Sequence, residues 1–140
     1  SWLTSKISEL SDQNLLKNYN KKSLQGRLHN EKDKISWDLV KQMYLEPKYI
    51  SPCHAGSLFG IITANGMVYP CEILDDSHKI GNIRNFDLDF KKLWFSKKAK
   101  EEVKFIRKTK CFCTHECFNA VNILFNPKFY PEIIKKSSLI

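Results

Sequence analysis

The β structure of this chain is decided by residues 58–73, which read LFGIITANGMVYPCEI. Two short apolar runs flank Asn65-Gly66, and this dipeptide is the strongest short-range signal for a two-residue type I′ hairpin turn. With that turn, Cys71 lies at the open end of the hairpin, opposite Gly60. The sequence therefore predicts a β-hairpin that presents a cysteine at its base.

The chain has five cysteines, and they fall into two groups. Cys53 and Cys71 flank the first strand of the predicted hairpin, whereas Cys111, Cys113 and Cys117 lie within seven residues, CFCTHEC. Thiolates gathered from distant segments, with C-x-C and C-x3-C spacings, are what proteins supply to zinc or to an iron-sulfur cluster. We therefore expect a metal site. Four thiolates suit tetrahedral zinc and a [4Fe-4S] cube equally well.

Bringing the two groups together requires a bend in the chain. An extended strand would hold the thiols of Cys53 and Cys71 roughly 20 Å apart, so residues 54–57 are expected to turn back. Gly56 and Gly60 allow such a bend and leave room for a bulky cluster beside the backbone. His115 is an alternative zinc ligand, although we interpret it as an exposed loop residue.

Length and cysteine usage define the class of protein. With 140 residues, the chain can bury one modest core. An odd number of cysteines, without a recognisable secretory segment, favours a reducing cytoplasm over a disulfide framework. No apolar stretch approaches the roughly 20 residues that span a bilayer, so no membrane association is expected.

Helices are expected on both sides of the hairpin. Apolar periodicity predicts them over residues 2–16, 37–46, 96–108, 118–125 and 129–136. Ser36 is a plausible N-cap for the second helix, and Pro47 stops that helix at the preceding residue. Polar residues 17–33 are expected to form a loop or a frayed helix, and Gly81-Asn82 a turn. Phe95 is expected in the core beneath the third helix.

The net charge is +8 and the pI is near 9.3. Such a balance permits nucleic acid, an acidic peptide or an anionic cofactor as partner. Seven basic residues precede Cys111, namely Lys97, Lys98, Lys100, Lys104, Arg107, Lys108 and Lys110. We interpret them mainly as a solvated surface, part of which offsets the charge of about −2 on a thiolate-ligated, oxidised cubane.

Taken in order, the motifs resemble a SPASM or twitch domain, the auxiliary-cluster domain at the C-terminus of radical SAM enzymes. The matching motifs are C-x12-G-x4-C over 53–71, IGNI at 80–83, Leu93-Trp94, and CTHECFNAVNILFNPKFYPEII over 113–134. The resemblance implies an α+β fold, with a β-hairpin followed by helices around a cysteine-ligated cluster. Residues 1–50 then form an N-terminal helical connector, and residues 51–140 the SPASM/twitch-like domain.

The resemblance also implies a ligand set. A full SPASM domain ends in more cysteines than are present here and holds two auxiliary clusters, so one [4Fe-4S] cluster is expected, as in the shortened twitch form. Cys53, Cys71 and Cys117 are the safest ligands. The fourth is Cys113 or Cys111, and the C-x3-C spacing favours Cys113.

In function, the resemblance implies an auxiliary cluster that relays electrons or positions a peptide or small-molecule substrate. The signature C-x3-C-x2-C, which leaves one iron free for S-adenosylmethionine, does not occur in this chain. We therefore expect the chain to be inactive alone and to depend on an upstream radical SAM barrel. An electron-donor protein is a further expected partner.

Two other interpretations remain open. The chain could be a zinc-stabilised basic module that binds nucleic acid or protein, although it lacks a C-x2-C knuckle and the aromatic-basic interleaving of single-strand binders. It could also be a remnant of a larger enzyme that folds without metal.

Overall fold

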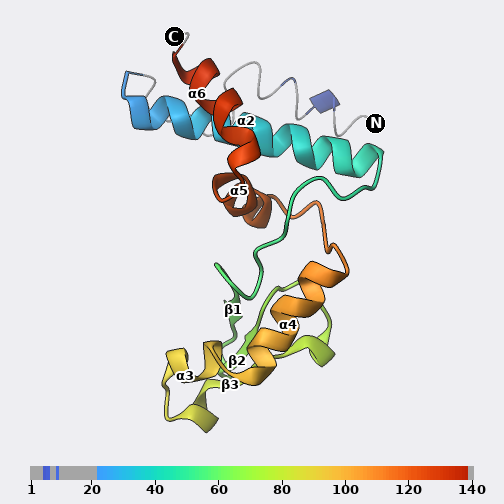
Figure 1. Cartoon of the computed structure of the whole chain (residues 1–140), viewed down its shortest axis with the longest axis vertical. Coiled ribbons are helices and arrows are strands. Elements are labelled where there is room, and N and C mark those ends of the chain that lie inside the picture. Colours follow the sequence, from blue (N-terminus) through green and yellow to red (C-terminus); the bar gives the residue numbers. More distant parts are fainter. Residues whose placement is uncertain (1–4, 7–8, 10–21, 139–140) are drawn as a thin grey trace. The chain divides into compact units, whose positions relative to one another are not determined.

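A computed structural model of the chain describes residues 5–6, 9 and 22–138 (Figure 1). The helix expected over residues 2–16 falls almost entirely outside the described residues. The chain divides into two compact units, one formed by Ser1–Ser51 with Cys113–Ile140 and the other by Pro52–Phe112. None of the described helices combines the length and apolarity needed to cross a membrane.

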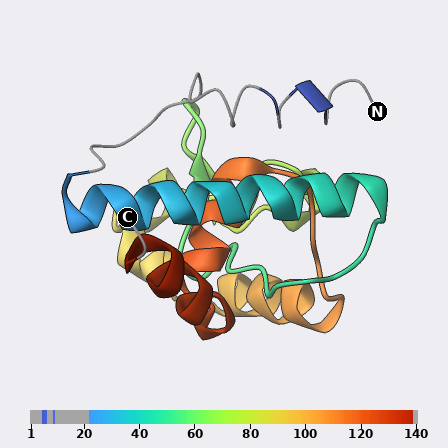
Figure 2. The ribbon, with the colours of Figure 1, turned by 90° about the horizontal axis from the view of Figure 1, so that it is seen from above.

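The first unit is helical. Its elements are α2 (Leu24–Leu45), α5 (Glu116–Leu124), the short 3-10 helix η3 (Pro127–Phe129) and α6 (Tyr130–Ser138). Helix α2 packs against α5 and α6 (Figures 1 and 2). Its buried core consists of Ile35, Leu39, Met43, Ile123, Phe129 and Ile133. The two C-terminal helices confirm the periodicity of the sequence, with a break at Asn126-Pro127.

The start of α2 corrects two expectations. The helix begins after Ser23, whose side chain accepts a hydrogen bond of 3.0 Å from the backbone N–H of Gly26. Residues 24–33 are therefore regular helix, and Ser36 lies in the helix interior with a fully buried side chain. Tertiary packing of Ile35 and its neighbours outweighs the weak helix propensity of this polar stretch.

The second unit contains a three-stranded antiparallel sheet in the order β1-β2-β3. Its strands are β1 (Ile61–Ile62), β2 (Met67–Tyr69) and β3 (Gly81–Asn82). The predicted hairpin is confirmed, because Ile61 pairs with Tyr69 and Ile62 with Val68. The turn expected at Gly81-Asn82 is wrong, since these residues pair with Val68 and Met67. Cross-strand pairing overrides their turn propensity.

The hairpin turn also differs from the expected type. Gly66 has φ +84°, whereas Asn65 is not among the residues with positive φ, so the I′ turn, which needs positive φ at both positions, does not form. Instead the N–H of Gly66 donates to Thr63 O (2.8 Å) and the N–H of Thr63 to Met67 O (2.9 Å). These bonds close a three-residue loop and shift the register by one residue.

Helices cover the rest of this unit. Two 3-10 turns, η1 (Asp76–His78) and η2 (Ile83–Phe86), precede α3 (Phe90–Trp94) and α4 (Lys97–Lys108). Helix α4 begins where expected, because Ser96 accepts from the N–H of Ala99. The core of the unit contains Val68, Ile80, Leu93 and Ala99. Phe95, expected in the core, is 65% exposed because it follows α3 as its C-cap residue.

Gly60 is where α3 meets the hairpin. A Cβ at this position would lie 2.6 Å from the six-membered ring of Trp94 and 2.8 Å from the backbone oxygen of Tyr69. The room that glycine leaves here is therefore filled by an indole and not by a cluster. This contact fixes α3 against the hairpin.

Gly60→Ala is expected to lower the free energy of unfolding by about 1–3 kcal/mol, because the added methyl group overpacks this contact. Urea unfolding followed by circular dichroism measures the change. In a Trp94→Leu background the cost should shrink, because the ring that collides with the methyl group is absent. An equal cost in both backgrounds would show that Trp94 does not contact Gly60.

Candidate metal centre

Cys71 lies directly after β2 and Pro70, at the base of the hairpin, and is 5% exposed. Its Sγ accepts a hydrogen bond from the backbone N–H of Ile73, with an N to S distance of 3.4 Å. A donor of this kind to sulfur is one of the features that set the potential of a thiolate-ligated cluster. Cys71 is therefore a buried sulfur with a suitable donor already in place.

Cys53 is half-buried and precedes a tight reversal of the chain. His54 O accepts from the N–H groups of Ser57 (3.1 Å) and Leu58 (2.9 Å), and the N–H of Gly56 donates to Phe59 O (2.8 Å). The bend expected after Cys53 is thus confirmed. Burial, with a further contribution from the charge of Arg107, lowers the pKa of His54, which favours its neutral form at neutral pH.

Cys111 is positioned by the C-terminus of α4. The N–H of Lys110 donates to Arg107 O (3.2 Å) and the N–H of Cys111 to Ile106 O (3.0 Å). Together with φ +50° at Lys110, these two bonds form a Schellman motif. Lysine occupies the left-handed position where glycine is usual, and the motif holds the half-buried Cys111 next to the helix end.

Cys113 and Cys117 belong to the helical unit. The buried side chain of Asn119 donates from Nδ2 to the backbone oxygen of Cys113 at 2.9 Å. Cys117 is exposed in the first turn of α5, with its Sγ 3.9 Å from Oε2 of Glu116. Asn119 therefore fixes the backbone of this short cysteine segment from within the helix.

His115 is not the exposed loop residue that the sequence predicts. It is half-buried, precedes α5 as its N-cap residue, and stacks on Phe118 with ring centroids 4.5 Å apart. Its imidazole therefore packs as an aromatic side chain on the first turn of the helix.

Asn119→Ala is expected to lower the free energy of unfolding by about 1–3 kcal/mol, because it removes a buried hydrogen bond. Thermal unfolding measures this loss. The same substitution at the exposed Asn85 serves as control and should change stability by less than about 0.5 kcal/mol. Equal losses in the two variants would show that Asn119 does not support the segment.

The thiols are divided between the two units. Cys53, Cys71 and Cys111 lie in Pro52–Phe112, and Cys113 and Cys117 in the other unit. All five are free. Within each unit taken by itself, no three Cys, His, Asp or Glu side chains of the described residues converge on a metal position. The ligand set predicted from the sequence therefore remains a prediction.

Sequence reasoning missed the groups that support the cysteines. The N–H of Ile73, the side chain of Asn119 and the left-handed conformation of Lys110 all act on the cysteines or their backbone. No sequence signal marks a backbone donor, but an asparagine within an otherwise apolar helix indicates a buried hydrogen bond. That signal was available at Asn119.

The chemistry of the donor set fits an iron-sulfur cluster, because the chain has five cysteines outside any disulfide and a cubane needs four thiolates. Residues 53–119, which contain every cysteine of the chain, match the family model of SPASM, an iron-sulfur cluster-binding domain. No curated protein and no solved structure matches the chain significantly. Residues 53–119 are therefore similar to SPASM, a family of iron-sulfur cluster-binding domains, and this segment is consistent with a SPASM/twitch domain.

Proposed function

We propose that this chain holds one auxiliary [4Fe-4S] cluster in the service of a radical SAM enzyme, where it acts in electron transfer or substrate positioning. The observation that carries the proposal is the family match, which spans all five cysteines. Domains of this family usually accompany a radical SAM domain. An upstream barrel of that kind would supply the S-adenosylmethionine chemistry that this chain lacks.

The proposed ligands are Cys53, Cys71, Cys113 and Cys117, with Cys111 as the alternative to Cys113. Support for Cys113 comes from its C-x3-C spacing to Cys117 and from the hydrogen bond that Asn119 makes to its backbone. Cys111 is held instead by the C-terminus of α4. A single cluster uses four of the five thiols, which leaves either Cys111 or Cys113 uncoordinated.

When bound, such a cluster supplies a one-electron carrier. The chain's own residues set the conditions for this role around Cys71. The backbone N–H of Ile73 donates to the sulfur, and the burial of Cys71 and Pro70 keeps water away from it. Four thiolate ligands leave no coordination position for a substrate, which favours electron transfer over direct substrate binding.

The wider assignment follows the same family. The substrate would be a peptide or a small molecule modified in the cytoplasm, and an electron-donor protein would be a further partner. The chain should not cleave S-adenosylmethionine alone, because it has no C-x3-C-x2-C motif.

Electron paramagnetic resonance after reduction tests this proposal on the full chain purified without oxygen. A reduced [4Fe-4S] cluster is paramagnetic, so dithionite should produce a signal that is absent before reduction. Zinc is redox-inert. A chain that holds zinc tightly, takes up no iron on anaerobic reconstitution and remains silent after reduction would contradict the redox function and support the zinc module instead.

A further inference from the structure

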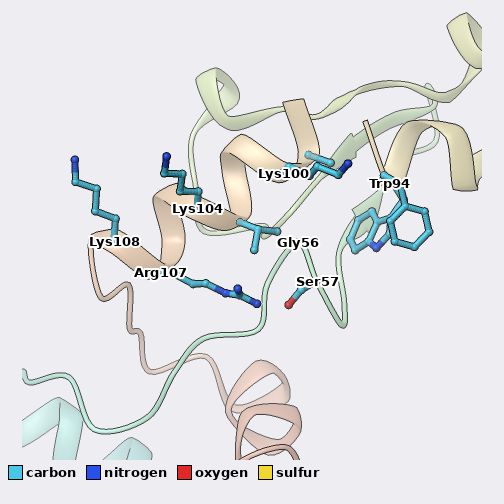
Figure 3. Close-up of a pocket in the computed structure, with 10 residues that line it drawn as sticks. Gly56, Ser57, Trp94, Lys100, Lys104, Arg107 and Lys108 are labelled. Carbon is cyan, nitrogen blue, oxygen red and sulfur yellow. The ribbon is translucent and has the colours of Figure 1, made fainter. Parts of the chain in front are cut away.

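A groove of about 630 Å³ runs along one side of α4 within the unit Pro52–Phe112. Its opposite wall is the turn at Gly56-Ser57, and Arg107 extends from α4 towards Ser57 (Figure 3). Its lining residues are Gly56, Ser57, Trp94, Phe95, Ala99, Lys100, Val103, Lys104, Arg107 and Lys108. No cysteine lines the groove, so it is distinct from the candidate metal centre.

All the charged residues that line the groove are basic. Both acidic residues of α4 are paired elsewhere, Glu101 with Lys97 at 3.9 Å and Glu102 with Lys98. Glu102 is also paired with His78 at 2.7 Å. The basic residues that line the groove form no ion pair with any described residue. Their combined field therefore favours a ligand with several negative charges.

The other side of the groove is apolar. Phe95 is 65% exposed, and Trp94, Ala99 and Val103 complete the surface. The Trp94 ring already stacks on Phe90, with centroids 5.2 Å apart, and abuts Gly60. Single-stranded nucleic acid needs successive free aromatic faces along a basic groove. Here Phe95 alone offers one, which favours an apolar side chain over a run of bases.

The spacing of the cations fits an extended peptide. Lys100, Lys104 and Lys108 follow one another at intervals of four residues on α4, which corresponds to about 6 Å along a helix. Alternate residues of an extended chain project to the same side about 6.6 Å apart. Carboxylates at alternate positions of a peptide would therefore meet successive lysines.

We propose that this groove binds an acidic peptide segment of a partner protein in an extended conformation. An apolar side chain of the segment contacts Phe95 and Val103, and carboxylates at alternate positions pair with the lysines of α4. Arg107 donates to a further carboxylate or to the peptide backbone. None of these residues is a proposed cluster ligand, so the inference stands independently of the proposed function.

The test is fluorescence anisotropy with a fluorescein-labelled peptide, Phe-Glu-Ser-Glu-Ser-Glu, and the full chain purified without oxygen. At roughly 0.15 M ionic strength, where long-range attraction is screened, the double variant Lys100→Gln, Lys104→Gln should bind about tenfold more weakly. The matched control, Lys91→Gln with Lys92→Gln on α3, removes the same charge outside the groove. It should weaken binding by less than about twofold.

The apolar contact is tested separately. Phe95→Ser should weaken binding of this peptide about fivefold, but should not affect a peptide in which serine replaces the phenylalanine. Iron content is expected to be unchanged in all these variants. If the unmodified chain retains iron but does not bind the peptide, this inference fails and the proposed function stands.

Three results would overturn the inference: no binding by the unmodified chain, equal weakening by the two lysine pairs, or a labelled oligothymidine that binds more tightly and displaces the peptide. The last result would assign the groove to single-stranded nucleic acid.

Discussion

Cys71→Ser is expected to abolish cluster binding by this chain. Cys71 is the most buried of the cysteines, and its Sγ already accepts the N–H of Ile73. Altering residues that merely support metal ligands typically costs about 10- to 100-fold in affinity, so removal of a ligand should cost more. Iron and acid-labile sulfide, determined after anaerobic reconstitution, should both fall close to zero.

The control for this loss is a cysteine that the proposal leaves uncoordinated. Cys111→Ser should retain iron and sulfide at the level of the unmodified chain, whereas Cys113→Ser should lose them. Circular dichroism of each variant separates loss of the cluster from loss of the fold. Full iron content in a folded Cys71→Ser chain would contradict the ligand set. If Cys113→Ser retains iron and Cys111→Ser loses it, the fourth ligand is Cys111.

Leu93→Ala is expected to cause the largest loss of stability within Pro52–Phe112. Leu93 has no exposed surface and packs with Val68, Ile80 and Ala99. Truncation of a fully buried leucine leaves a cavity and costs about 2–5 kcal/mol. Urea unfolding monitored by circular dichroism should show a correspondingly lower midpoint.

Leu88→Ala provides the matched control, because the same side chain is 68% exposed five residues earlier. Its effect should stay within about 0.5 kcal/mol. If Leu93→Ala were as mild as Leu88→Ala, the sheet and α4 would not share the core described above.

Local signals predicted the elements of the fold better than their boundaries. Asn65-Gly66 correctly predicted a hairpin, yet only Gly66 adopts positive φ, so that a three-residue loop forms. Ser36 has the chemistry of an N-cap, but a cap must stand where the chain enters the helix, and Ser23 takes that position. In both cases the residue type allows a local conformation, but the packing of the rest of the chain decides where that conformation occurs.

The strand β3 shows that local sequence signals do not reveal pairing between distant segments. Gly81-Asn82 is a turn dipeptide by composition, but Val68 on β2 supplies a partner for it from far along the sequence. Such long-range pairing leaves no local signal. Propensity alone therefore could not have predicted the third strand.

The sequence predicted the cysteines of the candidate site, but it did not predict the hydrogen bonds that hold them. Spacing alone identified the cysteines, and the family match covers the segment that contains them. The hydrogen bonds to Cys71 Sγ and to the backbone of Cys113 depend on local geometry around each residue. The sequence predicts a solvated basic surface before Cys111. Four of these basic residues also line a partly apolar groove, because Phe95 is exposed instead of entering the core.

The most direct test of the central claim is the stoichiometry of iron, acid-labile sulfide and zinc in the full chain after purification and reconstitution without oxygen. One auxiliary cluster predicts about four irons and four sulfides per chain, with zinc near zero. One tightly bound zinc per chain, with no sulfide and no iron uptake, would contradict it.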